Sequence, residues 1–414
     1  MINAKRLARW IQELGQFGAV RGEGITRTTF TDEEVKAREW LVQQMKNQSL
    51  AVQIDPAANI WGRRPGRTED APAIVFGSHI DTVPGGGKYD GALGVLVGLE
   101  VMATLEEQGI QTDHPLELVS FSGEEANPFG LSTFGSRSVS GKLTQQDIDG
   151  VVDSSGNVLT EVLERAGGSY ELFNNTKRSS KELAHFLELH IEQGRRLLDQ
   201  DVPLGIVTGI AGIYREVFHV QGEANHAGTT LMKDRKDALV AASTLVLELE
   251  KVCKAQSNEE VVATVGVFNV TPNAANIVPG DVRLVVEVRG QHAIERQNII
   301  SKLHVAAKKV ENDRGVRIDQ KIMLDQAEVY MDEQMIDVIE HVATQSETNS
   351  AQVTSMAGHD AAHMATLTPS GCLFVPSLKG ISHSPLEESR IDDIAKAANV
   401  FLKTVLALDH ERHR

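Results

Sequence analysis

Three apolar segments of the 414-residue chain end on histidine or carboxylate side chains. They read APAIVFGSH at 71–79, PLELVSFSGEE at 115–125 and AHFLELHIEQG at 184–194, and a helical pattern at 90–109 separates the first two. Buried strands that alternate with helices predict an α/β domain with a mostly parallel central sheet. Ligands of such sheets lie at the carboxyl ends of the strands, so we expect these polar residues to gather at one edge.

The middle of the chain has a different pattern. Between residues 211 and 326 the order is strand, helix, strand, strand, helix, strand, with amphipathic helices at 236–255 and 292–315. That order is typical of a split βαβ, ferredoxin-like α+β unit. Chain length also favours two domains. We therefore predict a domain of residues 1–210 and 327–414, with residues 211–326 inserted in it as a second domain.

Composition excludes several classes of partner. The net charge of −16 argues against nucleic acid or a membrane surface, because both bind basic faces. No run of about 18 apolar residues predicts a membrane span, and the N-terminal helical pattern has no apolar signal core. The two cysteines, Cys253 and Cys372, form no C-x-x-C pair, so we expect no disulfide framework and a cytoplasmic location.

The residues expected at the sheet edge have the composition of a dinuclear metal site. A pair of divalent ions needs a bridging carboxylate with terminal imidazole and carboxylate ligands. Asp90 is the natural bridge, and His79 and His190 are expected to hold one ion. Glu125, together with His383 of GISHSPLEE, is expected to hold the other. Imidazole with carboxylate suits Zn, Mn, Co or Ni better than Ca, so we predict two such ions per subunit, with Zn or Mn preferred.

Two further acidic residues have other expected roles. Asp81 lies two residues after His79 and, on extended backbone, points the same way, so it is expected to accept the other ring N–H of His79. Neighbouring side chains in a strand or turn point apart, so Glu124 and Glu125 seldom bind one ion. With Glu125 as the ligand, Glu124 faces the attacking water and takes its proton, a role that contributes ~10²–10⁴-fold to the rate.

Each of these signals alone has an ordinary structural explanation. An aspartate in the glycine-rich loop at 77–91 is usually a turn residue, and a Glu-Glu pair usually starts a solvated helix. The GGGK run in that loop lacks the G-x-x-x-x-G-K-[ST] frame and does not predict a phosphate loop. Five ligand-type residues at the ends of predicted strands make the metal site the stronger interpretation.

Several stretches, in chain order, resemble the signature motifs of the M20-type metallohydrolases. They read GSHIDTVPGGGKYDGALG, SGEEANPFG, LHIEQG, NHAGTT, NIVPG, AGHDA and GISHSPLE. The resemblance covers nearly the whole chain and is closest to the hydantoinase/carbamoylase branch: N-carbamoyl-L-amino-acid hydrolases, allantoate amidohydrolases and β-ureidopropionases. LHIEQG and AGHDA favour this branch over dipeptidases and aminoacylases. The resemblance implies a di-metal catalytic domain with an inserted lid that also forms a homodimer interface.

The resemblance also implies roles for individual residues. It places the metal roles on the five ligand residues named above, the base role on Glu124 and a supporting role on Asp81. Substrate contacts carry over by position. Gln193 would touch a carbamoyl end and His226 would stabilise a developing oxyanion. Asn276 would hydrogen-bond the substrate, Arg289 would bind a substrate carboxylate bidentately, and the backbone at Gly358 would approach the substrate.

The activity implied by the resemblance is hydrolysis of a ureido or amide C–N bond. The substrate would be a small carbamoyl or ureido acid with a carboxylate, such as an N-carbamoyl-L-amino acid or allantoate, and ammonia would be released. Two alternatives stay open: an aminoacylase or dipeptidase on the same scaffold, and a non-catalytic metal-binding relative. The sequence leaves undetermined the substrate, the native metal and the subunit that supplies the lid residues to each site.

Overall fold

The computed structural model describes residues 1–258 and 260–410. The chain divides into two compact units, one formed by residues 1–208 with those from 330 onward, the other by residues 209–329. The first unit is α/β with a large, mostly parallel sheet, and the second is α+β, so the predicted fold class is confirmed. No helix in the described ranges is both long and apolar enough to cross a membrane.

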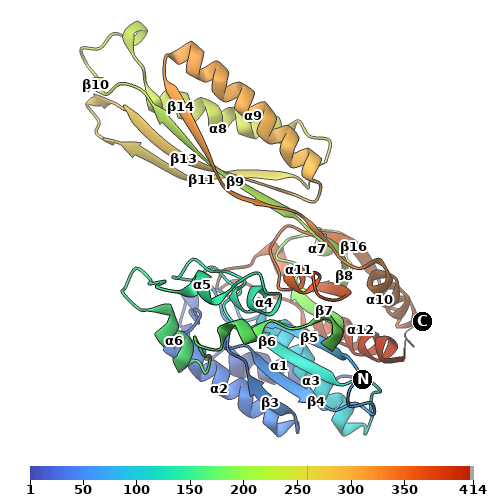
Figure 1. Cartoon of the computed structure of the whole chain (residues 1–414). Helices are drawn as coiled ribbons and strands as arrows, with labels where there is room; N and C mark the ends of the chain where they lie inside the picture. The colour runs from blue at the N-terminus through green and yellow to red at the C-terminus, as the bar shows by residue number, and fades with distance from the viewer. Residues whose placement is uncertain (259, 411–414) are drawn as a thin grey trace. The chain divides into compact units, whose positions relative to one another are not determined.

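A nine-stranded sheet forms the centre of the first unit (Figure 1). Its strands lie in the order β15–β8–β17–β7–β5–β6–β4–β3, and β16 pairs with β8. β17, β7, β5 and β6 are parallel neighbours, whereas the pairs β17–β8, β6–β4 and β4–β3 are antiparallel. The bounds are β3 (Ala51–Ile54), β4 (Ile60–Arg64), β5 (Ala73–His79), β6 (Leu116–Phe121), β7 (Leu183–Ile191), β8 (Leu204–Ile210), β15 (Val329–Tyr330), β16 (Ser350–Ser355) and β17 (Ser370–Val375).

The central strands are buried on both faces, which explains their mostly apolar sequences. Every residue of β5, β6 and β17 is buried, as expected for strands inside a parallel sheet. From β5 the chain continues to β6 on one side and later to β7 on the other. The strand order therefore reverses at β5, and such a switch point is where α/β sheets bind ligands.

The long helices of the first unit share one hydrophobic core with this sheet: α1 (Ala4–Leu14), α2 (Asp32–Asn47), α3 (Ala92–Glu107), α10 (Glu333–Gln345) and α12 (Ile391–His410). α3 is buried from Ala92 to Leu105, which fits its apolar sequence, because a helix that is hydrophobic all round belongs in a core. α3 begins at Ala92, two residues after Asp90, with Gly91 at its N-cap. The remaining helices and short strands are α4 (Phe134–Val139), α5 (Gln145–Ile148), α6 (Leu159–Arg165), α7 (Arg196–Asp199), α11 (Ala361–Met364), η1 (Phe173–Thr176), η2 (Ser180–Glu182), η4 (Leu378–Gly380), β1 (Ala19–Val20) and β2 (Gly24–Ile25).

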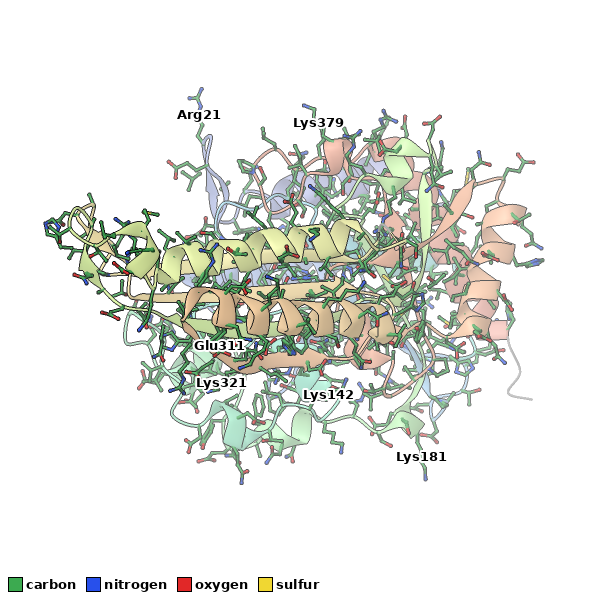
Figure 2. The ribbon with its side chains drawn as sticks, turned by 90° about the horizontal axis from the view of Figure 1, so that it is seen from above. Arg21, Lys142, Lys181, Glu311, Lys321 and Lys379 are labelled. Carbon is green, nitrogen blue, oxygen red and sulfur yellow. The ribbon has the colours of Figure 1, made fainter. Side chains whose placement is uncertain are left out.

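The second unit is a four-stranded antiparallel sheet with two helices on one face. The sheet order is β11–β13–β9–β14, and α8 and α9 lie side by side over it (Figures 1 and 2). Because β13 lies between β9 and β11, the unit is a split βαβ. Charged side chains such as Glu311 and Lys321 project from it (Figure 2). Its bounds are β9 (Gly212–Gln221), β10 (Asn225–His226), η3 (Met232–Asp234), α8 (Ala238–Lys254), β11 (Val262–Thr271), β12 (Ile277–Val278), β13 (Asp281–Gly290), α9 (Ala293–Arg314) and β14 (Arg317–Gln326).

One predicted boundary near the expected site is wrong. β6 ends at Phe121 rather than near Glu124. The next backbone N–H, that of Ser122, donates to the side-chain Oδ1 of Asn59 at 2.9 Å, so pairing with β4 stops there. Glu124 and Glu125 consequently lie in the turn that follows the strand.

Candidate metal centre

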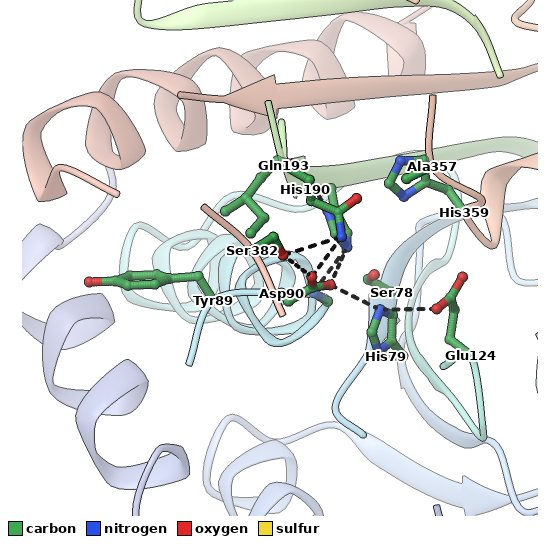
Figure 3. A network of polar contacts seen from close by, with 12 residues as sticks. Ser78, His79, Tyr89, Asp90, Glu124, His190, Gln193, Ala357, His359 and Ser382 are labelled. Atoms are coloured by element: carbon green, nitrogen blue, oxygen red, sulfur yellow. Dashed lines mark hydrogen bonds and ion pairs between the residues drawn. The ribbon is translucent and has the colours of Figure 1, made fainter. Parts of the chain in front are cut away.

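Imidazole and carboxylate side chains from separate parts of the first unit meet at the carboxyl ends of the central strands (Figure 3). His79 is the last residue of β5, and His190 is the penultimate residue of β7. Glu125 follows β6, and His383 lies between η4 and α12. Asp90 precedes α3. The structure therefore brings together the five residues that the sequence predicts as ligands.

Asp90 is shared by two groups of ligand-type atoms. Its Oδ1 lies 3.2 Å from His190 Nε2 and 3.8 Å from His79 Nε2. Its Oδ2 lies 3.4 Å from His383 Nε2, which in turn lies 3.1 Å from Glu125 Oε1. In each group the ligand atoms all lie within 4.8 Å of one another. One carboxylate with each oxygen aimed at a different group has the arrangement of a bridging ligand.

Main-chain contacts orient the two buried imidazoles. The Nδ1 of His190 lies 2.9 Å from the Ile191 carbonyl oxygen, and the Nδ1 of His79 lies 3.1 Å from the Asp81 carbonyl oxygen. The backbone N–H of Gly91 also donates to His190 Nε2 at 3.0 Å. In the neutral rings the two carbonyl contacts place the proton on Nδ1 and leave Nε2 unprotonated on the side of Asp90, which is the tautomer a metal ligand needs. The Gly91 N–H contact at His190 Nε2 agrees with this assignment.

A glycine makes room for the His79 ring. Gly91 has φ +61°, and a Cβ there would lie 2.2 Å from His79 Nε2. A side chain at this position would be strained and would displace the imidazole. The turn between Asp90 and α3 therefore depends on Gly91.

Asp81 lies beside His79 Nδ1 with two oxygens, and its carboxylate has further partners. The nearest Asp81 atom to His79 Nδ1 is the main-chain oxygen at 3.1 Å, and the carboxylate Oδ1 is at 3.5 Å. The carboxylate accepts the Thr29 hydroxyl at 2.8 Å and the backbone N–H groups of Glu124 and Glu125 at 3.3 and 3.2 Å. Asp81 thus ties the turn after β5 to the turn after β6.

Glu124 lies beside the ligand groups without belonging to either. Its Oε2 is 3.7 Å from His79 Nε2 (Figure 3), and its side chain is only 11% exposed. Burial raises the pKa of the Glu124 carboxyl well above its ordinary value, and the positive field of His79 opposes this rise. A carboxylate with a raised pKa at the edge of a candidate metal site has the properties of a general base.

The electrostatics of the site favour bound cations. Hydrogen bonds to Asp90 and Glu125 raise the pKa of His383 to about 10. Burial alone would raise the pKa of Asp90, but the charge and hydrogen bond of His190 hold it well below its ordinary value. The buried Oε1 of Glu125 lies 3.1 Å from His383 Nε2, and no second hydrogen bond to it is found in the described part of the chain. The ligand groups combine imidazole nitrogens with carboxylate oxygens, and this mixture of donors suits divalent Zn or Mn.

Residues that the sequence did not single out also touch the site. Ser382 Oγ lies 2.6 Å from Asp90 Oδ2, and Glu387 accepts the backbone N–H of Asp90 at 3.1 Å. Glu188 accepts the Ser78 hydroxyl at 2.6 Å directly beside His79. Ser382 and Glu387 flank His383 in the motif GISHSPLEE, and this adjacency is the signal by which they were detectable.

The predicted substrate-contact residues fall in both units. In the first unit, Gln193 Nε2 donates to Asp90 Oδ2 at 2.7 Å. Gly358 precedes α11, with open space where a Cβ would lie. In the second unit, His226 lies in β10, Asn276 directly precedes β12, and Arg289 lies in β13. All three belong to the unit of residues 209–329.

Comparisons with known proteins give a consistent result. A family model described as peptidase family M20/M25/M40 matches residues 75–407. An N-carbamoyl-L-amino acid amidohydrolase of Geobacillus stearothermophilus is 36% identical over 408 residues, which is 99% of each chain. An allantoate amidohydrolase of Bacillus subtilis is 36% identical over 384 residues, 91% of each. The crystal structure of a hydantoinase/carbamoylase family amidase from Burkholderia multivorans superposes with a TM-score of 0.91 at 31% identity, over 99% of this chain and 98% of that one.

Proposed function

The chain belongs to the peptidase M20/M25/M40 family, and on that premise we propose that it hydrolyses the ureido C–N bond of a small ureido or N-carbamoyl acid and releases ammonia. Relatives that are similar over almost the whole chain carry the names of carbamoylases and allantoate amidohydrolases. The observation that carries the proposal is the pair of ligand groups around Asp90 with Glu124 beside them.

We assign two divalent ions, Zn or Mn, to the two ligand groups. One ion would be held by His79, His190 and Asp90, and the other by Glu125, His383 and Asp90. Such a pair supplies Lewis-acid activation of a carbonyl group and of water. Elemental analysis of the purified protein tests the assignment: about two equivalents per chain are expected, and a metal-free yet active protein contradicts it.

Glu124 moves the proton in the proposed reaction. As a carboxylate it takes a proton from the attacking water, and as a carboxylic acid it returns that proton to the leaving nitrogen. Its raised pKa favours uptake of the proton from the attacking water, because burial makes the carboxylate a stronger base. For an N-carbamoyl amino acid, the balanced products are the amino acid, carbon dioxide and ammonia.

His226 is the proposed donor to the carbonyl oxygen as negative charge develops there. Its Nδ1 accepts the backbone N–H of Gly228 at 3.1 Å, so in the neutral ring the proton is on Nε2. An Nε2–H donor in a fixed tautomer is the form required for oxyanion stabilisation. Gln193, Asn276 and the backbone at Gly358 are the other proposed substrate contacts.

A substrate screen tests the proposed function directly. Ammonia release is measured for N-carbamoyl-L-amino acids, allantoate and ureidoglycolate after incubation with Mn²⁺ or Zn²⁺. N-acetyl amino acids and dipeptides are assayed in parallel by amino-acid release. Turnover of the ureido compounds alone supports the proposal. Turnover of acyl or peptide substrates alone identifies an aminoacylase or dipeptidase, and no turnover with metal bound points to a binding protein.

We predict that Arg289→Ala raises KM for carboxylate substrates by about 10–100-fold with little change in kcat. A charge-assisted hydrogen bond to a carboxylate contributes about 1.5–3 kcal/mol. The Arg289 Nε donates to Glu287 at 2.6 Å, which fixes the guanidinium on its strand. Arg283→Ala is the matched control, because Arg283 is an exposed arginine on the same face of β13. Equal KM values for both variants would remove the proposed role of Arg289.

We also propose a homodimer formed through the second unit. β11 is an edge strand of its sheet, with Val262 and Val267 exposed at 44% and 36%. An apolar edge strand is a template for pairing with another copy. Light scattering of the wild type is expected to give twice the chain mass. Val267→Lys is expected to lower the measured mass toward that of the monomer. Val152→Lys, at an exposed valine of the first unit, is expected to leave the measured mass unchanged. A monomeric wild type contradicts this proposal.

A cytoplasmic location is the last part of the proposal. Cys253 and Cys372 are both free thiols in the structure, which fits a reducing compartment. Fractionation of the source cells tests it, and recovery of the protein outside the cytoplasmic fraction contradicts it.

A further inference from the structure

One loop after η4 surrounds Asp90 with three side chains. His383 belongs to a ligand group, while Ser382 and Glu387 contact Asp90 itself (Figure 3 shows Ser382 beside it). Ser382 Oγ lies 2.6 Å from Asp90 Oδ2 and 3.1 Å from Glu387 Oε2. The hydroxyl thus links the side chains of the two acidic residues.

Glu387 holds the backbone that carries Asp90. Its Oε1 accepts the N–H of Tyr89 at 2.9 Å and the N–H of Asp90 at 3.1 Å. The residue is only 5% exposed. A Cβ at Gly87 would lie 2.2 Å from the same Oε1, so the segment before Asp90 wraps closely around the carboxylate. Two charge-assisted hydrogen bonds in a buried setting fix that segment.

We propose that Glu387 and Ser382 are positioning residues that set the backbone and the carboxylate rotamer of Asp90 for metal binding. The inference rests on the metal centre of the proposed function. A bridging carboxylate must present its two oxygens to two ions at once, and small displacements weaken both sites. Partners outside the ligand set orient metal ligands in this way, and their loss costs about 10–100-fold in metal affinity.

The contacts predict a graded series of variants. Glu387→Ala leaves two backbone N–H groups and the Ser382 hydroxyl without their acceptor, and we expect about 100-fold weaker metal binding. Glu387→Gln keeps an oxygen for both N–H groups and offers an amide donor to Ser382 Oγ, so it restores most of the affinity. Ser382→Ala removes the hydroxyl contacts to Asp90 and Glu387 but leaves both backbone N–H groups with their acceptor, and about tenfold weakening is expected. Glu388→Ala is the matched control, because Glu388 is an exposed glutamate next in the chain.

The experiment measures Mn²⁺ and Zn²⁺ dissociation constants of the full-length protein, stripped of metal, by competition with a chelating dye. The thermal midpoint of each metal-free variant is recorded alongside. Binding is expected to be weakest in Glu387→Ala, stronger in Ser382→Ala and stronger again in Glu387→Gln, while Glu388→Ala equals the wild type. The metal-free midpoint of Ser382→Ala is expected to stay unchanged. A purely structural role of Ser382 would change the midpoint rather than the dissociation constant.

Wild-type dissociation constants for both Glu387→Ala and Ser382→Ala would overturn the proposal. If Glu387→Ala does not fold, the metal dissociation constants of Ser382→Ala test the proposal, and wild-type values there overturn it. The assay contains no substrate, so its outcome is separate from that of the substrate screen. A wild type that binds no metal refutes the metal centre, whereas a wild type that binds two ions with unaffected variants refutes only the positioning roles.

Discussion

Replacing Glu124 with glutamine is expected to lower kcat by about 10²–10⁴-fold while metal content stays at the wild-type level. Glutamine has nearly the same shape but cannot accept the proton from water. Glu124 belongs to neither ligand group around Asp90, so binding of the proposed ions would not depend on it. The measurement is ammonia release at saturating substrate, paired with elemental analysis of the same preparation.

The geometry makes this variant informative. Glu124 Oε2 lies 3.7 Å from His79 Nε2, while Glu125, its neighbour, contacts His383 on the other ligand group. The two glutamates therefore have separable roles, and Glu125→Gln is expected to lose metal as well as activity. Glu171→Gln, at an exposed glutamate, is the control for the loss of one charge. Near-wild-type turnover by the Glu124 variant, with both ions bound, contradicts its assignment as the base.

The ends of β5 and β7 were predictable because they depend on local patterns, whereas the end of β6 was not. β5 begins with the apolar run AIVF and reaches His79 through Gly77 and Ser78, and β7 is a largely apolar segment up to His190 that contains His185 and Glu188. Burial on both faces of a parallel strand produces such runs, and parallel strands bring their carboxyl ends together. The apolar patterns of the two strands therefore indicate that His79 and His190 lie close together, although they are far apart in the sequence.

The motif GISHSPLEE places Ser382 and Glu387 near His383, but the contacts that they make with Asp90 were not predictable, because these depend on segments far apart in the sequence. Glu387 binds the backbone of Asp90 across 297 positions, and no periodicity links the two segments. Arg27 illustrates the same limit. It is fully buried, and its guanidinium donates to the carbonyl oxygens of Ile80 at 2.6 Å and of Leu14 at 3.0 Å. An arginine beside a run of threonines reads as a solvent-exposed charge, and only the packed structure shows that it supports the turn between His79 and Asp81.

Asp81 is an intermediate case. Its spacing from His79 indicates correctly that the two residues lie close together. Spacing does not determine which acceptor is nearest. The turn after β5 brings the main-chain oxygen of Asp81 to 3.1 Å and its carboxylate Oδ1 to 3.5 Å from His79 Nδ1, while the carboxylate also accepts from Thr29 and the two glutamate N–H groups. The choice among nearby acceptors is set by backbone dihedral angles that the sequence alone does not show.

Asp90→Asn is expected to lower activity by about 10³-fold or more through loss of the metal pair. Each carboxylate oxygen of Asp90 faces a different ligand group, Oδ1 toward His190 and Oδ2 toward His383. An amide keeps one oxygen, places an NH₂ group where the second ion needs an acceptor, and removes the negative charge between two dications. Lewis-acid activation contributes several kcal/mol to catalysis, and each 1.36 kcal/mol is about tenfold in rate.

Metal stoichiometry and spectroscopy distinguish this loss from a general disruption of folding. Wild-type protein loaded with Mn²⁺ is expected to show an electron paramagnetic resonance signal of two coupled ions, because one carboxylate joins them. The Asp90→Asn protein is expected to retain one ion at most, with an uncoupled signal, whereas Asp70→Asn, at an exposed loop position, keeps the coupled pair. Adding excess Mn²⁺ should not restore turnover to the Asp90 variant, since the bridge itself is missing. Two tightly bound, still-coupled ions in Asp90→Asn would show that another group joins the sites, and the dinuclear arrangement around Asp90 would then have to be given up.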